Sequence, residues 1–128
     1  MSKLIILAVD DSPSMREMLA AVLRDSGYHV VEAEDGVKAL EAAKSNSIDV
    51  VLTDQNMPNM DGLSLVKNLR GLPAYKDTPI MMLTTESSAE MKQKGRDAGA
   101  TGWMVKPFDP DKLVRMLKSL IGMKRQGA

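Results

Sequence analysis

The chain has 128 residues, of which 44% are hydrophobic and 27% charged, as expected for one globular domain that buries a core. Its 17 basic side chains balance 17 acidic ones, so neither nucleic acid nor a membrane surface is expected as a partner. The absence of cysteine excludes disulfides, thiolate metal sites and cysteine catalysis. The apolar segment 4–9 is too short to cross a bilayer and lacks the layout of a signal peptide, so we expect a cytoplasmic protein.

Short apolar runs predict the strands of a sheet. The run that opens the chain, Leu-Ile-Ile-Leu-Ala-Val, is apolar at every position, as a parallel strand covered on both faces must be. Similar runs follow it at intervals that leave room for helices. The predicted strands are 4–9, 29–33, 50–53, 80–83 and 103–105.

Helical periodicity fills the intervals between these runs. The first helix should be capped by Ser12, begin at Pro13 and stop at Gly27. Weaker patterns predict helices at about 35–45, 63–69 and 87–98, and the last helix should open at Asp109-Pro110 and close at Gly122. Strands that alternate with helices in this way predict an α/β fold with a parallel sheet.

Polar residues follow the predicted central strands, at the sheet edge where ligands bind in parallel α/β proteins. Asp10 and Asp11 follow the first strand, Asp54 the third, Thr84 the fourth and Lys106 the fifth. Two unit charges about 4 Å apart repel by about 4 kcal/mol at an effective dielectric near 20, so the three carboxylates should either have shifted pKa values or bind a cation. Mg²⁺ fits, because it binds through one or two carboxylates together with phosphate. A carboxylate nucleophile, a metal and a lysine predict phosphoryl transfer.

These motifs resemble those of response-regulator receiver domains, in an order and spacing that cover essentially the whole chain. They are Asp10-Asp11, the segment Asp54-Gln55-Asn56-Met57-Pro58-Asn59-Met60-Asp61-Gly62, Thr84-Thr85-Glu86 and Lys106-Pro107-Phe108. With no output domain, and with Asn56 and Glu86 at the family's variable site positions, the chain is most similar to stand-alone chemotaxis regulators of the CheY type. The resemblance implies one receiver domain over residues 1–128, with a flavodoxin-like (βα)5 three-layer sandwich and a parallel sheet of strand order 2-1-3-4-5.

The resemblance also implies the phosphoacceptor and the metal ligands. Asp54 would carry the phosphoryl group. Mg²⁺ would be held by Asp11, Asp54 and the backbone carbonyl of Asn56, whereas Asp10 would act largely through ordered water.

Three further residues are implied to respond to the phosphoryl group. Lys106 would pair with its oxygens, and a cis bond to Pro107 would aim the lysine inward. Thr84 would move to donate a hydrogen bond to it; Thr85 is a local rival, because strand alternation lets only one of the two face the pocket easily. Trp103, which stands where the family usually has Tyr or Phe, would turn inward behind Thr84. Its indole is larger than those rings and can only donate a hydrogen bond.

The expected function is that of a phosphoacceptor in a two-component system, of the chemotaxis kind by resemblance. A sensor histidine kinase like CheA would phosphorylate Asp54, and the surface of the fourth helix, last strand and last helix would change its affinity for a partner. A flagellar motor switch protein and a phosphatase are the other candidate partners, and we expect a monomer. The chain would assist its own phosphorylation and dephosphorylation only, and would otherwise not be an enzyme.

Other protein classes use similar residues. A phosphatase of the haloacid dehalogenase type needs a second Asp two residues after its nucleophile, where this chain has Asn56. A flavodoxin-like mononucleotide carrier needs donors after the first strand, where Asp10 and Asp11 would repel phosphate. An EF-hand loop is excluded by Pro58 and Asn59. Two alternatives stay open: a receiver domain cut from a longer protein, and one that serves as a phosphate sink for a kinase.

Overall fold

One parallel sheet forms the centre of the molecule. The computed structural model describes residues 3–126, with side chains up to residue 122. The strand order is β2-β1-β3-β4-β5, which confirms the order implied by the resemblance. The strands are β1 (Ile5–Val9), β2 (His29–Ala33), β3 (Val50–Thr53), β4 (Ile80–Thr84) and β5 (Gly102–Val105).

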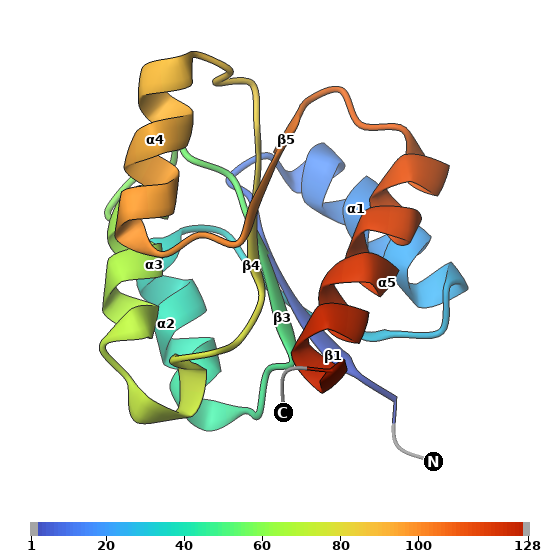
Figure 1. Cartoon of the computed structure of the whole chain (residues 1–128). Helices are drawn as coiled ribbons and strands as arrows, with labels where there is room; N and C mark the ends of the chain where they lie inside the picture. The colour runs from blue at the N-terminus through green and yellow to red at the C-terminus, as the bar shows by residue number, and fades with distance from the viewer. Residues whose placement is uncertain (1–2, 127–128) are drawn as a thin grey trace.

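Helices cover both faces of this sheet. Figure 1 shows α1 and α5 on one face and α2, α3 and α4 on the other, which makes the predicted three layers. The helices are α1 (Pro13–Asp25), α2 (Gly36–Ser45), α3 (Gly62–Arg70), α4 (Ala89–Ala98) and α5 (Pro110–Gln126). A short 3₁₀ helix, η1 (Pro73–Tyr75), lies between α3 and β4 and was not predicted.

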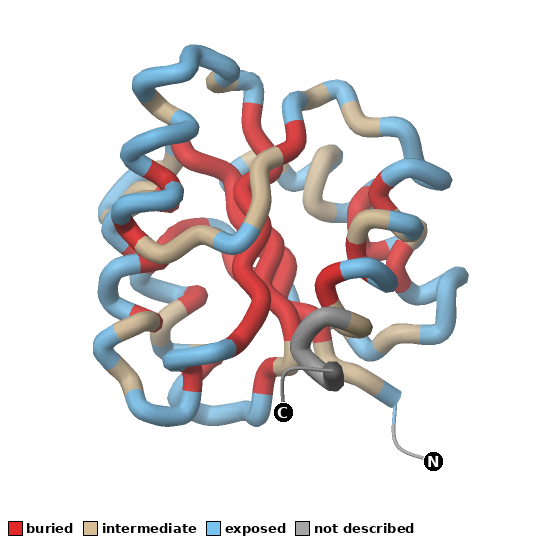
Figure 2. Tube along the Cα trace, in the orientation of Figure 1, coloured by how far each residue is buried: buried red, intermediate tan, exposed pale blue. Residues whose placement is uncertain are grey.

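The core consists of two layers, one on each face of the sheet. Alternate residues of β1 point to opposite faces: Leu7 and Val9 pack with α2, α3 and α4, whereas Ile6 and Ala8 pack with α1 and α5. All four side chains are buried, and Figure 2 shows the central strands as the buried part of the chain. Burial of an aliphatic side chain contributes about 1.5–3 kcal/mol, so the apolar runs that predicted the strands also stabilise the sheet.

Helix starts follow the predicted capping chemistry. The Ser12 hydroxyl accepts a hydrogen bond from the Met15 amide at 3.3 Å, directly before Pro13. The first helix ends as predicted, because Gly27 adopts a φ of 93°. Asp109 opens the last helix by accepting from the Asp111 amide at 2.9 Å.

The predicted end of the last helix was wrong. The sequence placed it at Gly122, but α5 continues to Gln126. A glycine ends a helix when it adopts a left-handed conformation, and only Gly27 and Gly99 have positive φ among the described glycines. Inside a helix it merely costs about 1 kcal/mol relative to alanine, which the packing of α5 on the sheet outweighs.

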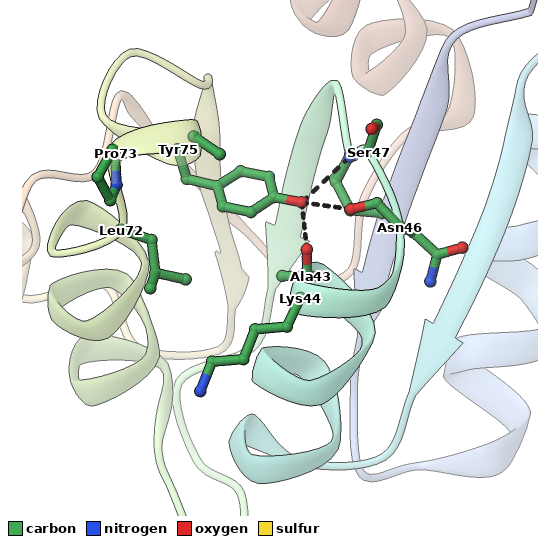
Figure 3. A pocket seen from close by; sticks show the side chains of 9 residues that line it. Ala43, Lys44, Asn46, Ser47, Leu72, Pro73 and Tyr75 are labelled. Atoms are coloured by element: carbon green, nitrogen blue, oxygen red, sulfur yellow. Dashed lines mark hydrogen bonds between the residues drawn. The ribbon is translucent and has the colours of Figure 1, made fainter.

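The amino edge of the sheet, where the strands begin, is held by Tyr75. Its hydroxyl lies 2.5 Å from the Ala43 carbonyl and 2.7 Å from the Asn46 carbonyl, and accepts from the Ile48 amide at 3.3 Å. Figure 3 shows the ring reaching from η1 to the end of α2, beside a surface pocket of about 440 Å³. The contact fixes the turn that leads into β3.

Within the part of the chain that the structure describes, none of the helices combines the length and apolarity that a membrane span requires.

Candidate functional site

The carboxyl edge of the sheet brings the predicted site residues together. Because β1 and β3 are neighbours and Val9 pairs with Thr53, Asp10 and Asp54 leave the sheet side by side. The Asp54 amide donates to the Val9 carbonyl at 3.0 Å, which extends the pairing to the acid itself. Lys106 continues from β5 in the same way, since its amide donates to the Thr84 carbonyl at 2.9 Å.

Three carboxylates meet at this edge. One oxygen from each of Asp10, Asp11 and Asp54 lies within 4.8 Å of the others. Asp10 is 2% exposed and Asp54 is 9% exposed, whereas Asp11 faces solvent and its side chain makes no hydrogen bond or ion pair with the described residues. The cluster therefore offers only oxygen ligands, with one carboxylate free on the solvent side. Such a donor set fits a hard divalent cation like Mg²⁺.

Lys106 partly balances this negative charge. Its Nζ lies 2.6 Å from Asp10 Oδ2 and 3.1 Å from Asp54 Oδ2, and its side chain is only 9% exposed. Burial would lower the pKa of Lys106, but hydrogen bonds and charge attraction from Asp10 and Asp54 outweigh burial and raise it. The lysine is therefore charged at neutral pH. The predicted cis bond between Lys106 and Pro107 is present, and the ammonium lies between the acids.

Backbone amides hold the remaining oxygens of the two buried acids. Asp54 Oδ1 accepts from the Gln55 amide at 2.7 Å, and Asp10 Oδ1 accepts from the Ser12 amide at 2.9 Å. Each buried carboxylate thus has one oxygen on an amide and the other on Lys106. The carboxylates are fixed in place before any ligand arrives.

Two loops meet at the solvent side of the site. The Asn56 side-chain amide donates to Glu86 Oε1 at 3.2 Å, which joins the loop after β3 to the loop after β4. Asn56 is exposed, and the role of its backbone carbonyl as a metal ligand stays a prediction.

Thr84 and Trp103 both contact Glu86. Thr84 is fully buried as the last residue of β4, and Thr85 is exposed, so Thr84 is the inward member of the pair. The Thr84 hydroxyl accepts from the Glu86 amide at 3.3 Å, and Trp103 Nε1 donates to the Glu86 carbonyl at 2.8 Å. The movements predicted for both side chains stay predictions.

Sequence reasoning missed two residues that support the acids. Arg16 donates to the Asp10 backbone carbonyl at 2.7 Å from the first turn of α1. The buried Gln55 side chain accepts from the Leu63 amide at 2.9 Å and donates to Asp61 at 3.3 Å, which fixes the loop after Asp54. A polar residue directly after Asp54 was the only sequence signal for Gln55, and Arg16 had none beyond its nearness to Asp10.

Comparison with known proteins identifies the family. The model of the response regulator receiver domain matches residues 6–118. The chemotaxis protein CheY-3 of Vibrio cholerae is 42% identical over 104 residues, 80% of each chain. The structure of V. cholerae CheY4 has a TM-score of 0.90 at 49% identity, covering 93% of this chain and 99% of that one.

A further solved structure bears on the metal. The receiver domain of the sensor histidine kinase PA1611 from Pseudomonas aeruginosa has a TM-score of 0.88 at 30% identity, covering 94% of this chain and 99% of that one. It was solved with a magnesium ion coordinated in the active site cleft.

The chain therefore belongs to the response regulator receiver domains. Among them it is similar to the CheY-type proteins of chemotaxis, which is consistent with a role in two-component signalling.

Proposed function

We propose that the protein is a switch that accepts a phosphoryl group on Asp54 from a histidine kinase. The observation that carries this proposal is the buried pair of carboxylates, Asp10 and Asp54, bridged by the Lys106 ammonium at 2.6 and 3.1 Å. A structural ion pair would need one acid. The second buried acid and the exposed Asp11 add negative charge that the described residues leave uncompensated, as expected where a cationic cofactor and a phosphoryl group bind.

The proposed reaction is a transfer between two nucleophiles. A carboxylate oxygen of Asp54 attacks the phosphorus of phosphohistidine, the P–N bond breaks, and the imidazole leaves with the bonding electrons. Lys106 already lies beside Asp54 Oδ2, so it can pair with the phosphoryl oxygens without reorganisation. Water later takes the phosphoryl group and restores the carboxylate. The protein thus acts on its own side chain and on no further substrate.

The carboxylate cluster would hold Mg²⁺ through Asp11, Asp54 and the carbonyl of Asn56, with Asp10 acting through water. When bound, Mg²⁺ supplies positive charge that neutralises the phosphoryl oxygens. Asp11 is suited to this role, because it is the exposed member of the cluster.

The output surface in this proposal consists of α4, β5 and α5. A groove of about 370 Å³ lies there, lined among others by Lys92, Trp103, Val105, Lys112 and Met116. Val105, which lines this groove, is 39% exposed and so offers an apolar contact at this surface. Phosphorylation would shift the population of this surface toward a form that binds a partner, for which a flagellar motor switch protein is the candidate. A phosphate sink would use the same site without such a partner.

The test uses a small phosphodonor. Protein incubated with Mg²⁺ and acetyl phosphate should gain the mass of one phosphoryl group, and chelation of Mg²⁺ should prevent the gain. Asp54→Asn should abolish it, whereas Asp25→Asn, which removes an exposed acid at the end of α1, should leave it unchanged. No gain in the natural sequence, or an equal gain in Asp54→Asn, would contradict the proposal.

A further inference from the structure

Trp103 occupies space that a side chain on α4 would need. A Cβ atom added to Gly95 would lie 2.6 Å from Trp103 Cζ3 and 3.0 Å from Cε3, which is closer than side chains tolerate. Gly95 is buried inside α4, where glycine costs about 0.5–1 kcal/mol relative to alanine. Because glycine disfavours the helix at this position, the contact with the indole gives a physical reason for its presence.

The indole in this position is hydrogen-bonded to the loop after β4. Its Nε1 donates to the Glu86 carbonyl at 2.8 Å. A phenylalanine would have no donor, and a tyrosine would carry its hydroxyl at a different place. The bond therefore depends on the indole and on where the ring lies.

Glu86 is held at three points, two of which reach the proposed phosphorylation site. Its amide donates to the Thr84 hydroxyl at 3.3 Å, its carbonyl accepts from Trp103, and its carboxylate accepts from Asn56 at 3.2 Å. Thr84 ends β4, and Asn56 lies two residues after Asp54. A shift of the indole would therefore alter the position of the loop that borders the site.

The ring has room to be displaced. Two hollows are lined by Trp103, one of about 140 Å³ with Lys92 and Arg96, the other being the groove between α4, β5 and α5. A displacement of about 1 Å would stretch the bond to Glu86 beyond hydrogen-bonding distance. The tight contact at Gly95 and the nearby space together make the ring position sensitive to this one residue.

We infer that Gly95 is a positioning residue for the switch: its missing side chain seats the indole of Trp103 where Nε1 holds the Glu86 carbonyl, and this fixes the loop after β4 beside Asp54. The contacts that carry the inference exist without phosphorylation, and only its consequence for phosphoryl chemistry rests on the proposed function. The position of the Trp103 ring therefore depends on the absence of a side chain at Gly95.

The first measurement is the emission of Trp103, the only tryptophan of the chain. In unphosphorylated Gly95→Ala the emission should shift to the red and acrylamide should quench it more strongly, because the displaced ring meets solvent. Amide hydrogen exchange at Glu86 should become faster in the same variant. Gly122→Ala is the matched control, since a Cβ there meets nothing within 4 Å, and both signals should stay as in the natural sequence.

The second measurement is a double-mutant cycle with Trp103→Val, whose short side chain does not reach Gly95. Gly95→Ala should lower the urea midpoint when Trp103 is present and raise it when combined with Trp103→Val, because the helix then gains alanine without a clash. Loss of the same size in both backgrounds, or unchanged emission and exchange in Gly95→Ala, would overturn the inference. The rate of phosphorylation by acetyl phosphate should change when Gly95→Ala is introduced into the natural sequence. It should change little when Gly95→Ala is introduced into Trp103→Val. Failure of Asp54 to be phosphorylated at all would refute the proposed function and leave the other two results standing.

Discussion

The two edges of the sheet treat their polar groups differently. At the amino edge, the Tyr75 hydroxyl is surrounded by backbone partners, and Asp49 accepts from the Ile5 amide at 2.8 Å. At the carboxyl edge, two of the three carboxylates share one ammonium, and Asp11 has no partner among the described side chains. The polar groups named at the amino edge are satisfied within the chain, whereas the carboxyl edge retains negative charge.

The two edges of the sheet should thus contribute differently to the stability of the fold and to the chemistry of the site. Like charges about 4 Å apart cost about 4 kcal/mol at an effective dielectric near 20, so the carboxyl edge lowers the stability of the fold. The neutral hydrogen bonds of the Tyr75 hydroxyl have no such cost. Substitutions at the carboxyl edge should therefore change phosphorylation as well as stability, and those at the amino edge should change stability alone.

The largest effect is expected from Lys106→Met. The rate of phosphorylation by acetyl phosphate should fall by about 100-fold or more, the scale expected when a preorganised charge is removed. The free energy of unfolding should fall by about 3 kcal/mol at pH 7, because two carboxylates lose their partner. Mass spectrometry and urea unfolding measure the two effects. Lys44→Met, an exposed lysine at the amino edge, should change neither.

The pH dependence of this variant checks the charge of Lys106. The pKa of Lys106 in the folded protein is raised by its hydrogen bonds to Asp10 and Asp54, which outweigh burial. Its contribution is therefore complete below the unfolded pKa of about 10.4 and is lost as pH rises through the higher folded pKa. The stability difference between the natural sequence and Lys106→Met should be constant from pH 7 to 9 and shrink above that window. A difference that grows with alkaline pH would contradict the assignment.

Tyr75→Phe tests the amino edge. Removal of the hydroxyl takes away the one O–H donor that the Ala43 and Asn46 carbonyls share and should lower the free energy of unfolding by about 1–3 kcal/mol. The phosphorylation rate should be unchanged, because the ring lies at the end of the sheet away from Asp54. A normal stability combined with slower phosphorylation would refute the separation of the two edges.

The features that sequence could predict depend on patterns along the chain. The apolar runs located the strands, and the rule for parallel sheets placed Asp10, Asp54 and Lys106 at one edge. The contact between Gly95 and Trp103 was not predictable, because no sequence spacing links a residue of α4 to the residue of β5 whose ring occupies the space of its side chain. The same holds for Tyr75, whose partners lie about 30 residues away, at the end of α2 and in the turn that follows it.

Asp35→Ala should have a smaller effect at the carboxyl edge. Asp35 caps α2 by accepting from the Lys38 amide at 2.8 Å, and also accepts from Asn59 at 2.8 Å in the loop after Asp54. The free energy of unfolding should fall by about 1 kcal/mol at pH 7. Asp35→Asn should lower it less, because Asn also caps helices well.

The acid dependence of the Asp35 contribution follows from its pKa. The hydrogen bonds from Lys38 and Asn59 lower the pKa of Asp35, so its contribution is present above the unfolded value of about 3.9 and is lost as pH falls through the folded one. The stability gap between the natural sequence and Asp35→Ala should therefore narrow in acid. Urea unfolding between pH 7 and pH 3 measures this, and a gap that widens in acid would show that the carboxylate is not stabilised by these donors.

Gly122→Ala should have the smallest effect and the opposite sign. Gly122 lies at the amino edge beside Leu4 and Tyr28, inside the helix that the sequence ended too early. A Cβ there meets nothing within 4 Å, so alanine should raise the free energy of unfolding by about 0.5–1 kcal/mol and leave phosphorylation unchanged. Gly27→Ala is the control, because its Cβ also meets nothing but its φ of 93° is strained for alanine. Equal gains in the free energy of unfolding at both glycines would mean that the space around the added Cβ alone decides whether alanine stabilises. A loss at Gly27 with a gain at Gly122 would show that α5 continues through Gly122 with ordinary helical geometry.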